Sequence, residues 1–299
     1  MTPSQGSRDG ARVREILPIN GVSQAVTIGG GGPPLLILSG PGVAFSRAPR
    51  LFALWEAAFT VVHWDQPGAG LSAGPVSLKR LVADGLAVVE AVRARLGVSK
   101  VAVLGMSGGS VAGLSMAAAR PDLISVYAGT GQFVDWERQD ALSYHLVLQR
   151  ARKAGDAAAV AELQGIGAPP YGDAATDAIK SKYAGALTPA EQAVFADPNV
   201  MTPPDGAPVV DQRALAMAAY AAVRDDLMAF KARDLGAIAT PAVFLQGTLD
   251  VYSVSSEVDA YAREIGATYV AVEGGGHSAM FMVPEMLALL VAHVRPLAG

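Results

Sequence analysis

A short glycine-rich segment, Gly105-Met-Ser-Gly-Gly109, constrains the fold of this chain more than any other feature of its sequence. It follows the apolar run KVAVLG (residues 100–105) and precedes a small-residue stretch of helical character that continues to Pro121. The five residues match the pattern G-x-S-x-G, in which the serine occupies a sharp, strained turn between a strand and a helix. Side chains two positions before and after such a serine would collide, so small residues are needed at both places. The segment therefore predicts a buried strand, a tight turn at Ser107 and a buried helix.

Apolar runs and helical patterns alternate through the first third of the chain. The β-rich runs of this region cover residues 12–18, 23–29, 34–39, 60–65 and 100–105. The first two are joined by Asn20-Gly21, a dipeptide that favours a tight hairpin turn. Arg47–Phe59 is expected to form a helix, and Ser77 is expected to cap another helix that ends at Gly97. This alternation predicts a mostly parallel sheet covered by helices on both faces.

The alternation is interrupted from about Asp135 to Leu235, where only helix-like segments and loops rich in Pro and Gly occur. Within it, Thr188-Pro-Ala-Glu191 is a capping box with proline at the first helical position. Strand patterns resume with PAVFLQG (241–247) and TYVAVE (268–273).

These patterns predict one α/β fold with an eight-stranded, mostly parallel sheet flanked by helices. Its core is expected to comprise residues 1–134 and 236–299. Residues 135–235 are expected to form a helical lid, or cap, inserted after the sixth strand.

Composition excludes several classes of protein. The 23 Lys and Arg residues against 27 Asp and Glu give 23 − 27 = −4, so no basic surface for nucleic acid or anionic membranes is expected. The absence of cysteine excludes disulfides and thiolate catalysis and favours a cytoplasmic location. The N-terminal segment lacks the apolar core of a signal peptide. No metal-ligand or cofactor motif occurs, so no metal and no cofactor are expected.

A serine nucleophile needs a base, and the chain contains four histidines. His277 directly follows Gly274-Gly-Gly276, so it is expected just past the carboxyl end of a strand, where open α/β sheets place their sites. The others are interpreted as structural or lid-surface residues: His63 within a strand, His145 in the lid and His293 in the last helix. The pattern favours His277 as the general base.

The base in turn needs a carboxylate that orients it and stabilises its protonated form. Asp250 begins a loop just after the run PAVFLQG and is the first choice, with Asp135 as the competing acid. The chain order Ser107, Asp250, His277 is the order of α/β-hydrolase triads.

An oxyanion hole requires two backbone N–H donors near the serine. The segment Leu38-Ser-Gly-Pro-Gly42 follows the third strand, and its Pro41 cannot donate. Gly40 is therefore expected to supply one donor, and Gly108 the other.

Several motifs resemble those of the proline iminopeptidase-like branch of the α/β-hydrolase superfamily, peptidases that remove N-terminal proline. The resemblance runs through nearly the whole chain. It rests on LSGPG (38–42) beside the family's HGGPG, WDQPGAGLS (64–72) beside WDQRGxGxS, GMSGGS (105–110), GTLD (247–250) and GGGHSAMFMVPE (274–285).

The resemblance implies an α/β-hydrolase fold in which Ser107, Asp250 and His277 form the triad. It also implies cleavage of an ester or amide bond in a small molecule or short peptide through an acyl-enzyme. The chain departs from the family's motifs at two places, where Leu38-Ser-Gly40 stands for His-Gly-Gly and Pro67 for the arginine of DQRG. These departures leave an esterase or lactonase as open as a prolyl peptidase.

Peptidases of this kind resemble one another in using lid glutamates to hold the free amine of the substrate. Glu137, Glu162 and Glu191 lie in the predicted lid, but none matches a motif, and each is expected to be a solvated helix residue. Two further alternatives are a triad diverted to lyase or acyltransferase chemistry and a ligand-binding protein that keeps the hydrolase shell.

Overall fold

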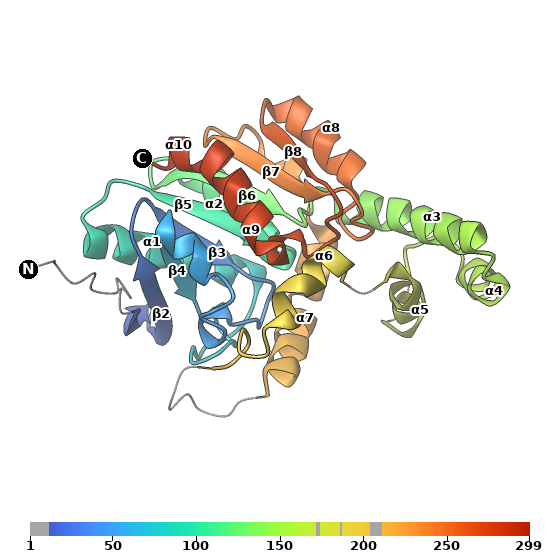
Figure 1. Cartoon of the computed structure of the whole chain (residues 1–299), viewed down its shortest axis with the longest axis horizontal. Helices are drawn as coiled ribbons and strands as arrows, with labels where there is room; N and C mark the ends of the chain where they lie inside the picture. Colours follow the sequence, from blue (N-terminus) through green and yellow to red (C-terminus); the bar gives the residue numbers. More distant parts are fainter. Residues whose placement is uncertain (1–11, 172–173, 186, 204–210) are drawn as a thin grey trace, which may run out of the picture.

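The computed structural model describes residues 12–171, 174–185, 187–203 and 211–299. The described strands form one eight-stranded sheet in the order β1-β2-β4-β3-β5-β6-β7-β8 (Figure 1). The strands are β1 (Val13–Ile19), β2 (Val22–Gly30), β3 (Pro34–Leu38), β4 (Thr60–Trp64), β5 (Val101–Met106), β6 (Ile124–Thr130), β7 (Ala242–Gly247) and β8 (Thr268–Val272). The expected eight-stranded, mostly parallel sheet is confirmed.

The sheet is antiparallel only at its amino-terminal edge. β1 pairs with β2 and β2 with β4 in antiparallel fashion, whereas the pairs from β4 through β8 are parallel. Asn20 and Gly21 join β1 to β2 with φ angles of 46° and 83°. Positive φ at both central residues is the mark of a tight hairpin turn, and Asn-Gly favours it, which confirms the predicted hairpin.

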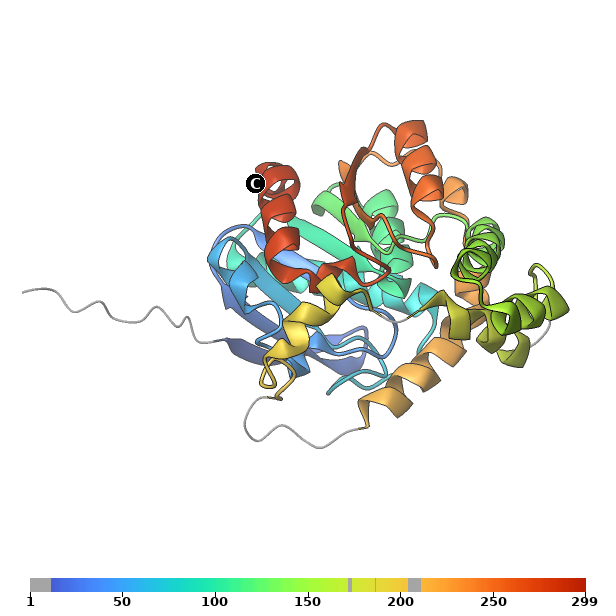
Figure 2. The same ribbon diagram turned by 45° about the vertical axis from the view of Figure 1, so that its right-hand side comes forward.

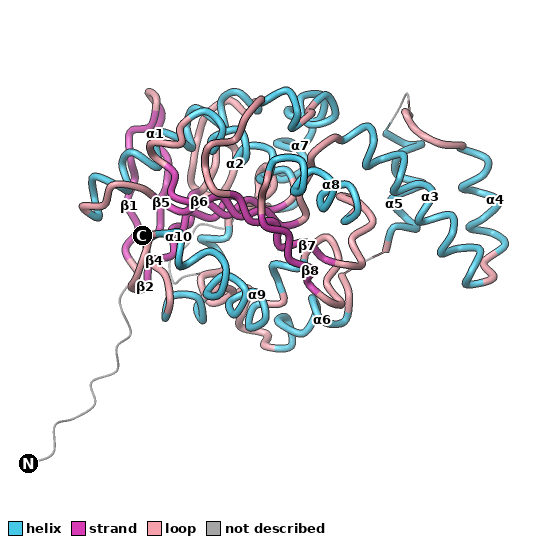
Figure 3. Tube along the Cα trace, turned by 90° about the horizontal axis from the view of Figure 1, so that it is seen from above, coloured by secondary structure: helices cyan, strands magenta, loops and turns pink. Residues whose placement is uncertain are grey.

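Helices cover both faces of the parallel part of the sheet (Figure 3). The described α-helices are α1 (Leu78–Leu96), α2 (Gly108–Ala119), α3 (Trp136–Ala154), α4 (Ala157–Ile166), α5 (Ala174–Ala184), α6 (Pro189–Gln192), α7 (Gln212–Ala229), α8 (Ser255–Ile265), α9 (Val283–Leu289) and α10 (Arg295–Ala298). One hydrophobic cluster joins the sheet to α1, α2 and α8, and a second joins its other face to α9 and α10. Because both faces are covered, β3, β5 and β7 are buried along their whole length.

The segment predicted as a helix over Arg47–Phe59 is not an α-helix. One short 3₁₀ helix, Phe45–Arg47, ends at its first residue, and a second, Ala53–Ala57, lies within it beyond Pro49. Pro49 disfavours helical backbone at the preceding Ala48, which has φ −123° and ψ 61°, so a helix cannot run through this point. The apolar side chains still serve as core, since Trp55 is fully buried and its Nε1–H donates to the Val283 carbonyl at 2.9 Å.

Helices α3 to α7 occupy the chain between β6 and β7, and no strand of the described residues interrupts them. Figures 1 and 2 show α3, α4 and α5 gathered at one end of the molecule, with α7 running back beside the sheet layer. Helices α3 to α7 together are called the inserted helices below. The division into a core of 1–134 and 236–299 and a lid of 135–235 stays a prediction.

Among the described residues, no helix combines the length and apolarity needed to cross a bilayer.

Candidate active site

Ser107 lies in the turn that joins β5 to α2, with φ 55° and ψ −128°. Positive φ is costly for a residue that carries a side chain, so the surroundings must hold this turn in place. A Cβ built on Gly105 would lie 2.7 Å from the Cα of Ser110, and one on Gly109 would collide with the Ser39 carbonyl oxygen. The predicted requirement for small residues two positions to either side of the serine is confirmed.

Hydrogen bonds from neighbouring elements hold the Ser107 turn. The Ser110 hydroxyl donates to the Ser107 carbonyl at 2.6 Å and accepts from the Phe133 amide at 3.1 Å. The hydroxyl of Tyr127, from β6, donates to the Ser110 carbonyl at 2.9 Å. These contacts tie the start of α2 to the segment that follows β6.

His277 lies in the loop after β8, and its Nε2 is 2.9 Å from Ser107 Oγ. The rings of Phe133 and Tyr252 flank the imidazole, with centroids 5.6 and 5.1 Å away. The carbonyl of His277 passes so close to Gly131 that a Cβ on that glycine would lie 2.6 Å from it. The structure thus brings together a serine and a histidine that are far apart in the chain.

Asp250, in the loop after β7, faces the other ring nitrogen of His277. Its Oδ2 lies 3.1 Å from Nδ1, and its Oδ1 lies 3.2 Å from the same atom. The carboxylate is buried and also accepts from the amides of Tyr252 at 2.8 Å and Ser253 at 3.0 Å. The side-chain amide of Gln246 donates to it at 2.8 Å. This set of donors fixes the orientation of the carboxylate.

The two groups shift each other's pKa in the directions expected of an ion pair. Burial alone would lower the pKa of His277, but the carboxylates of Asp250 and, more weakly, Glu191 reverse this and raise it. Burial alone would raise the pKa of Asp250, but His277 and the hydrogen bonds from Ser253 and Tyr252 bring it below its usual value. The arrangement therefore stabilises the imidazolium that forms when a neutral His277 accepts a proton.

Asp135, the competing acid, has a different position. It is the N-cap of α3, and its carboxylate accepts from the Arg138 amide at 3.1 Å. The described residues show no contact between Asp135 and His277, whereas both carboxylate oxygens of Asp250 reach that ring. The structure therefore pairs His277 with Asp250.

The two predicted oxyanion donors lie on facing segments. Gly108 is the first residue of α2, so its amide has no partner within the helix. A Cβ on Gly108 would lie 2.7 Å from Pro41 Cδ, which places the loop after β3 directly against the helix start. The carbonyl of Gly40 accepts from the Val43 amide at 3.2 Å. The role of Gly40 and Gly108 as oxyanion donors stays a prediction.

A cavity of about 200 Å³ opens onto Ser107 and His277. Its remaining walls are Pro41, Gly108, Phe133, Trp136, Tyr220, Leu227 and Tyr252. Most are aromatic or aliphatic, and Trp136, Tyr220 and Leu227 come from the inserted helices. The cavity suits a small, largely apolar group next to the serine.

A smaller cavity of about 80 Å³ shares four aromatic walls with the first and ends at charged residues. Lys180 is buried there against Asp140 and lies 3.6 Å from Asp177. Burial lowers the pKa of Lys180 to about 8. No sequence motif marked this charged group, because its members come from two helices of the insertion.

Glu191 was expected to be solvated, and that prediction is wrong. Glu191 is only 1% exposed, and its Oε1 accepts from the Gly276 amide at 2.9 Å. The carboxylate therefore holds the residue directly before His277. Glu137 is exposed as expected, and Glu162 lies at the surface with Lys182 and Tyr183 as partners.

The described residues contain no group of three or more His, Asp or Glu side chains placed to hold a metal ion. Of the other histidines, His63 is buried in β4 and His145 is exposed on α3.

A model of the alpha/beta hydrolase fold family matches residues 33–282. The chain belongs to this family. A probable aminopeptidase of Bacillus subtilis (strain 168) is 31% identical to it over 168 residues, in a match that covers 53% of this chain and 50% of the relative. The match thus spans only about half the length of this curated relative. The family and this relative support a hydrolase.

Solved structures share the fold of this α/β hydrolase at lower identity. The proline iminopeptidase-related protein of Thermus thermophilus has a TM-score of 0.64 at 20% identity, over 96% of this chain and 99% of that one. A thermophilic esterase of Thermogutta terrifontis has a TM-score of 0.62 at 17% identity, over 97% of this chain and all of the other (100%). Each likeness shows the fold.

Proposed function

We propose that this α/β hydrolase is a serine hydrolase that cleaves an ester or amide bond through an acyl-enzyme. The observation that carries the proposal is the unbroken line of contacts from Ser107 Oγ to His277 Nε2 and from His277 Nδ1 to Asp250. A serine hydroxyl is a weak nucleophile at its own pKa, and an adjacent oriented base is what activates it.

In the first half of the reaction, Ser107 Oγ attacks the substrate carbonyl carbon while His277 Nε2 accepts the hydroxyl proton. Asp250 stabilises the imidazolium that forms. The amides of Gly40 and Gly108 donate to the oxyanion of the tetrahedral intermediate. His277 then passes its proton to the leaving oxygen or nitrogen, the bond to the leaving group breaks, and the acyl group stays on Ser107.

In the second half, a water molecule takes the place of the leaving group. His277 accepts one proton from that water as its oxygen attacks the acyl carbon. Collapse of the second tetrahedral intermediate breaks the bond to Ser107 Oγ and returns the proton to it, which releases the acid.

The first substrate class is an N-terminal prolyl amide or a related small aminoacyl amide. Support comes from the aminopeptidase relative and from the motifs shared with proline iminopeptidase-like enzymes. The cavity of about 200 Å³ is also of a size for a compact acyl group.

The second candidate is a short-chain ester, and a specific observation favours it. The three glutamates between Asp135 and Leu235 that could hold a substrate amine all lie outside the walls of the Ser107 cavity. The walls are mainly apolar, which suits an uncharged acyl group.

The test compares turnover of a prolyl arylamide with that of short-chain p-nitrophenyl esters by the same preparation. A kcat/KM for the prolyl amide well above that for the esters supports the peptidase, and the reverse order supports the esterase. Labelling of Ser107 by a fluorophosphonate probe tests the mechanism separately from the substrate. Absence of an adduct at Ser107 would remove the serine-hydrolase proposal itself.

A further inference from the structure

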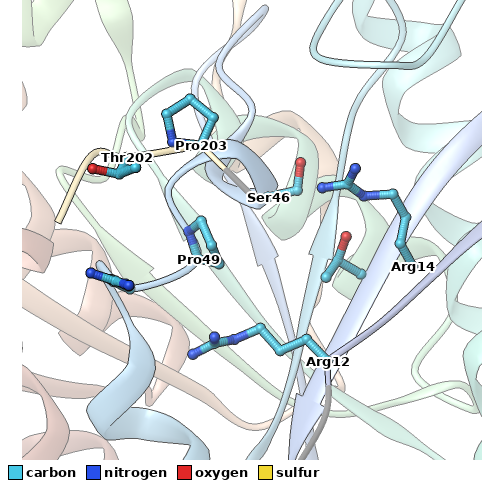
Figure 4. A pocket seen from close by; sticks show the side chains of 8 residues that line it. Arg12, Arg14, Ser46, Pro49, Thr202 and Pro203 are labelled. Atoms are coloured by element: carbon cyan, nitrogen blue, oxygen red, sulfur yellow. The ribbon is translucent and has the colours of Figure 1, made fainter. Parts of the chain in front are cut away.

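A separate pocket of about 380 Å³ lies over the amino-terminal hairpin and shares no wall with the Ser107 cavity (Figure 4). Its lining includes three arginines and three hydroxyl side chains, namely Arg12, Arg14, Arg50, Thr27, Ser46 and Thr202. Nothing in the proposed hydrolytic reaction uses this pocket. Its composition is also opposite in character to the aromatic cavity at Ser107.

Strand register places the basic side chains on one face of the sheet. Arg14 is directly opposite Thr27 in the β1–β2 pair, and Thr27 is directly opposite His63 in the β2–β4 pair. Side chains of directly opposed residues stand on the same face. Arg12 is two residues before Arg14 and therefore shares that face as well. Figure 4 shows the side chain of Arg14 extending toward Ser46 and that of Arg12 extending toward the side of the pocket where Pro49 lies.

Positive charge exceeds negative charge around the pocket. Glu56 pairs with Arg12, with 2.6 Å between Oε1 and Nε. Burial raises the pKa of the Asp65 carboxyl, and the charge of Arg14 partly opposes this rise. The carboxyl oxygens already accept from the Ser46 hydroxyl and from the Leu71 amide. Neither Arg14 nor Arg50 forms a salt bridge with any residue that the structure describes.

The Thr27 hydroxyl provides an independent indication of a ligand. Thr27 is 5% exposed and lines the pocket, yet its Oγ1 has no hydrogen-bond partner among the described residues. A buried hydroxyl without a partner is costly, and nearly all such groups in folded proteins are satisfied. The oxygen itself is covered and not open to the pocket, so a ligand can satisfy it only if the Thr27 side chain turns toward the arginines, where an anion with several acceptor oxygens fits.

We infer that this pocket binds a phosphate group, either free or carried on a small molecule. The planar guanidinium groups of Arg14 and Arg50 match the paired oxygens of a phosphate, and a turn of the Thr27 side chain brings its hydroxyl to a further oxygen. Arg12 adds charge while keeping its contact to Glu56. The volume exceeds that of one phosphate, which leaves room for part of an attached molecule.

The experiment measures binding to the full chain by calorimetry and by thermal shift, at constant ionic strength set with sodium chloride. The probes are inorganic phosphate and glucose 6-phosphate. The wild type should bind at least one saturably, with a dissociation constant on the order of 1 mM or tighter. Equal affinities identify free phosphate as sufficient, and tighter binding of the sugar phosphate shows that the attached molecule contributes.

Two variants and a matched control locate the site. Arg14→Gln should weaken binding about tenfold, as expected for loss of a charge-assisted hydrogen bond. Thr27→Val should weaken it a few-fold without lowering the melting temperature of the free protein, because the removed hydroxyl has no partner there. Arg152→Gln removes the same charge from the exposed surface of α3 and should leave binding unchanged.

The inference is overturned by absence of saturable binding in the wild type, or by equal loss in Arg14→Gln and Arg152→Gln. If Arg14→Gln does not fold, Thr27→Val and Arg50→Gln carry the test. Unchanged phosphate affinity in both of those variants would likewise overturn it.

Discussion

The sheet edge that carries Ser107 and the inserted helices that face it are built in different ways. At the sheet edge, three loops after β5, β7 and β8 are held by buried backbone and by hydrogen bonds to neighbouring strands and to one another. The inserted helices have one small hydrophobic cluster of their own, around Tyr144, Val147 and Leu163. Their contribution to the Ser107 cavity is a few side chains such as Trp136 and Tyr220. The contrast suggests that the sheet edge determines the reaction and the inserted helices determine what is bound.

The strongest way to break this comparison is to remove the serine hydroxyl. Ser107→Ala should lower kcat by roughly 10⁴- to 10⁶-fold on any ester or amide substrate, because the nucleophile is lost. The fold should remain, since only one atom is removed and the backbone of the turn is unchanged. Steady-state assays measure the loss, and a thermal melt checks the fold. Activity close to wild type in a folded Ser107→Ala protein would contradict the assignment of the sheet edge to the reaction.

A second test separates the two candidate acids. Asp250→Asn should lower kcat about 10⁴-fold, because an amide cannot hold the imidazole in the required tautomer or stabilise its charge. Asp135→Asn is the matched control, since asparagine is as good an N-cap as aspartate, so activity should change by less than about twofold. Comparable losses of kcat in the two variants would mean that the contacts of His277 in the structure do not identify the carboxylate that acts in the reaction.

The inserted helices should affect substrate binding more than the chemical step. Tyr220→Ala removes a wall of the cavity and should raise KM about tenfold with little change in kcat, as expected for one lost aromatic contact. Met217→Ala changes a more exposed residue of the same helix that is not a wall and should leave both constants unchanged. A large fall in kcat with unchanged KM in Tyr220→Ala would instead place α7 in the chemistry.

Local sequence patterns predicted the sheet edge well because its determinants are local. The turn at Ser107 needs Gly105 and Gly109 for steric reasons that act within five residues. Asn20-Gly21 determines its own turn in the same way. The segment Arg47–Phe59 was mispredicted because its apolar spacing also suits 3₁₀ turns packed on a core, and Pro49 prevents the longer helix.

Glu191 shows where local patterns stop being informative. Its capping box with Thr188 was predicted and is confirmed, since the Thr188 amide donates to Glu191 Oε2 at 2.7 Å. The second carboxylate oxygen meets the amide of Gly276, 85 residues further along the chain. That contact depends on how α6 packs on the loop before His277, and no spacing in the sequence encodes it. The walls of the Ser107 cavity were unpredictable for the same reason.

The smallest expected effect concerns this contact between the inserted helices and the sheet edge. A negative charge near His277 stabilises the imidazolium and raises its pKa, and Glu191 contributes to this rise together with Asp250. Glu191→Gln keeps an oxygen that can accept from Gly276 but removes the charge, so the pKa of His277 should fall. The general base must be neutral, so the acid limb of kcat/KM should move to lower pH, by on the order of half a unit.

A pH profile of kcat/KM for the wild type, Glu191→Gln and Glu137→Gln measures this shift. Glu137 is exposed and pairs only loosely with Lys231, at 3.5 Å, so its variant controls for the loss of a glutamate charge elsewhere in the insertion. Glu191→Gln should also cost about 1 kcal/mol of stability, because the Thr188 amide loses its acceptor. A lower melting temperature with an unmoved acid limb would mean that Glu191 contributes to stability alone. The inserted helices would then affect substrate binding without affecting the pKa of His277. A shifted limb would show that the inserted helices also tune the histidine, so the division between the two regions would not be complete.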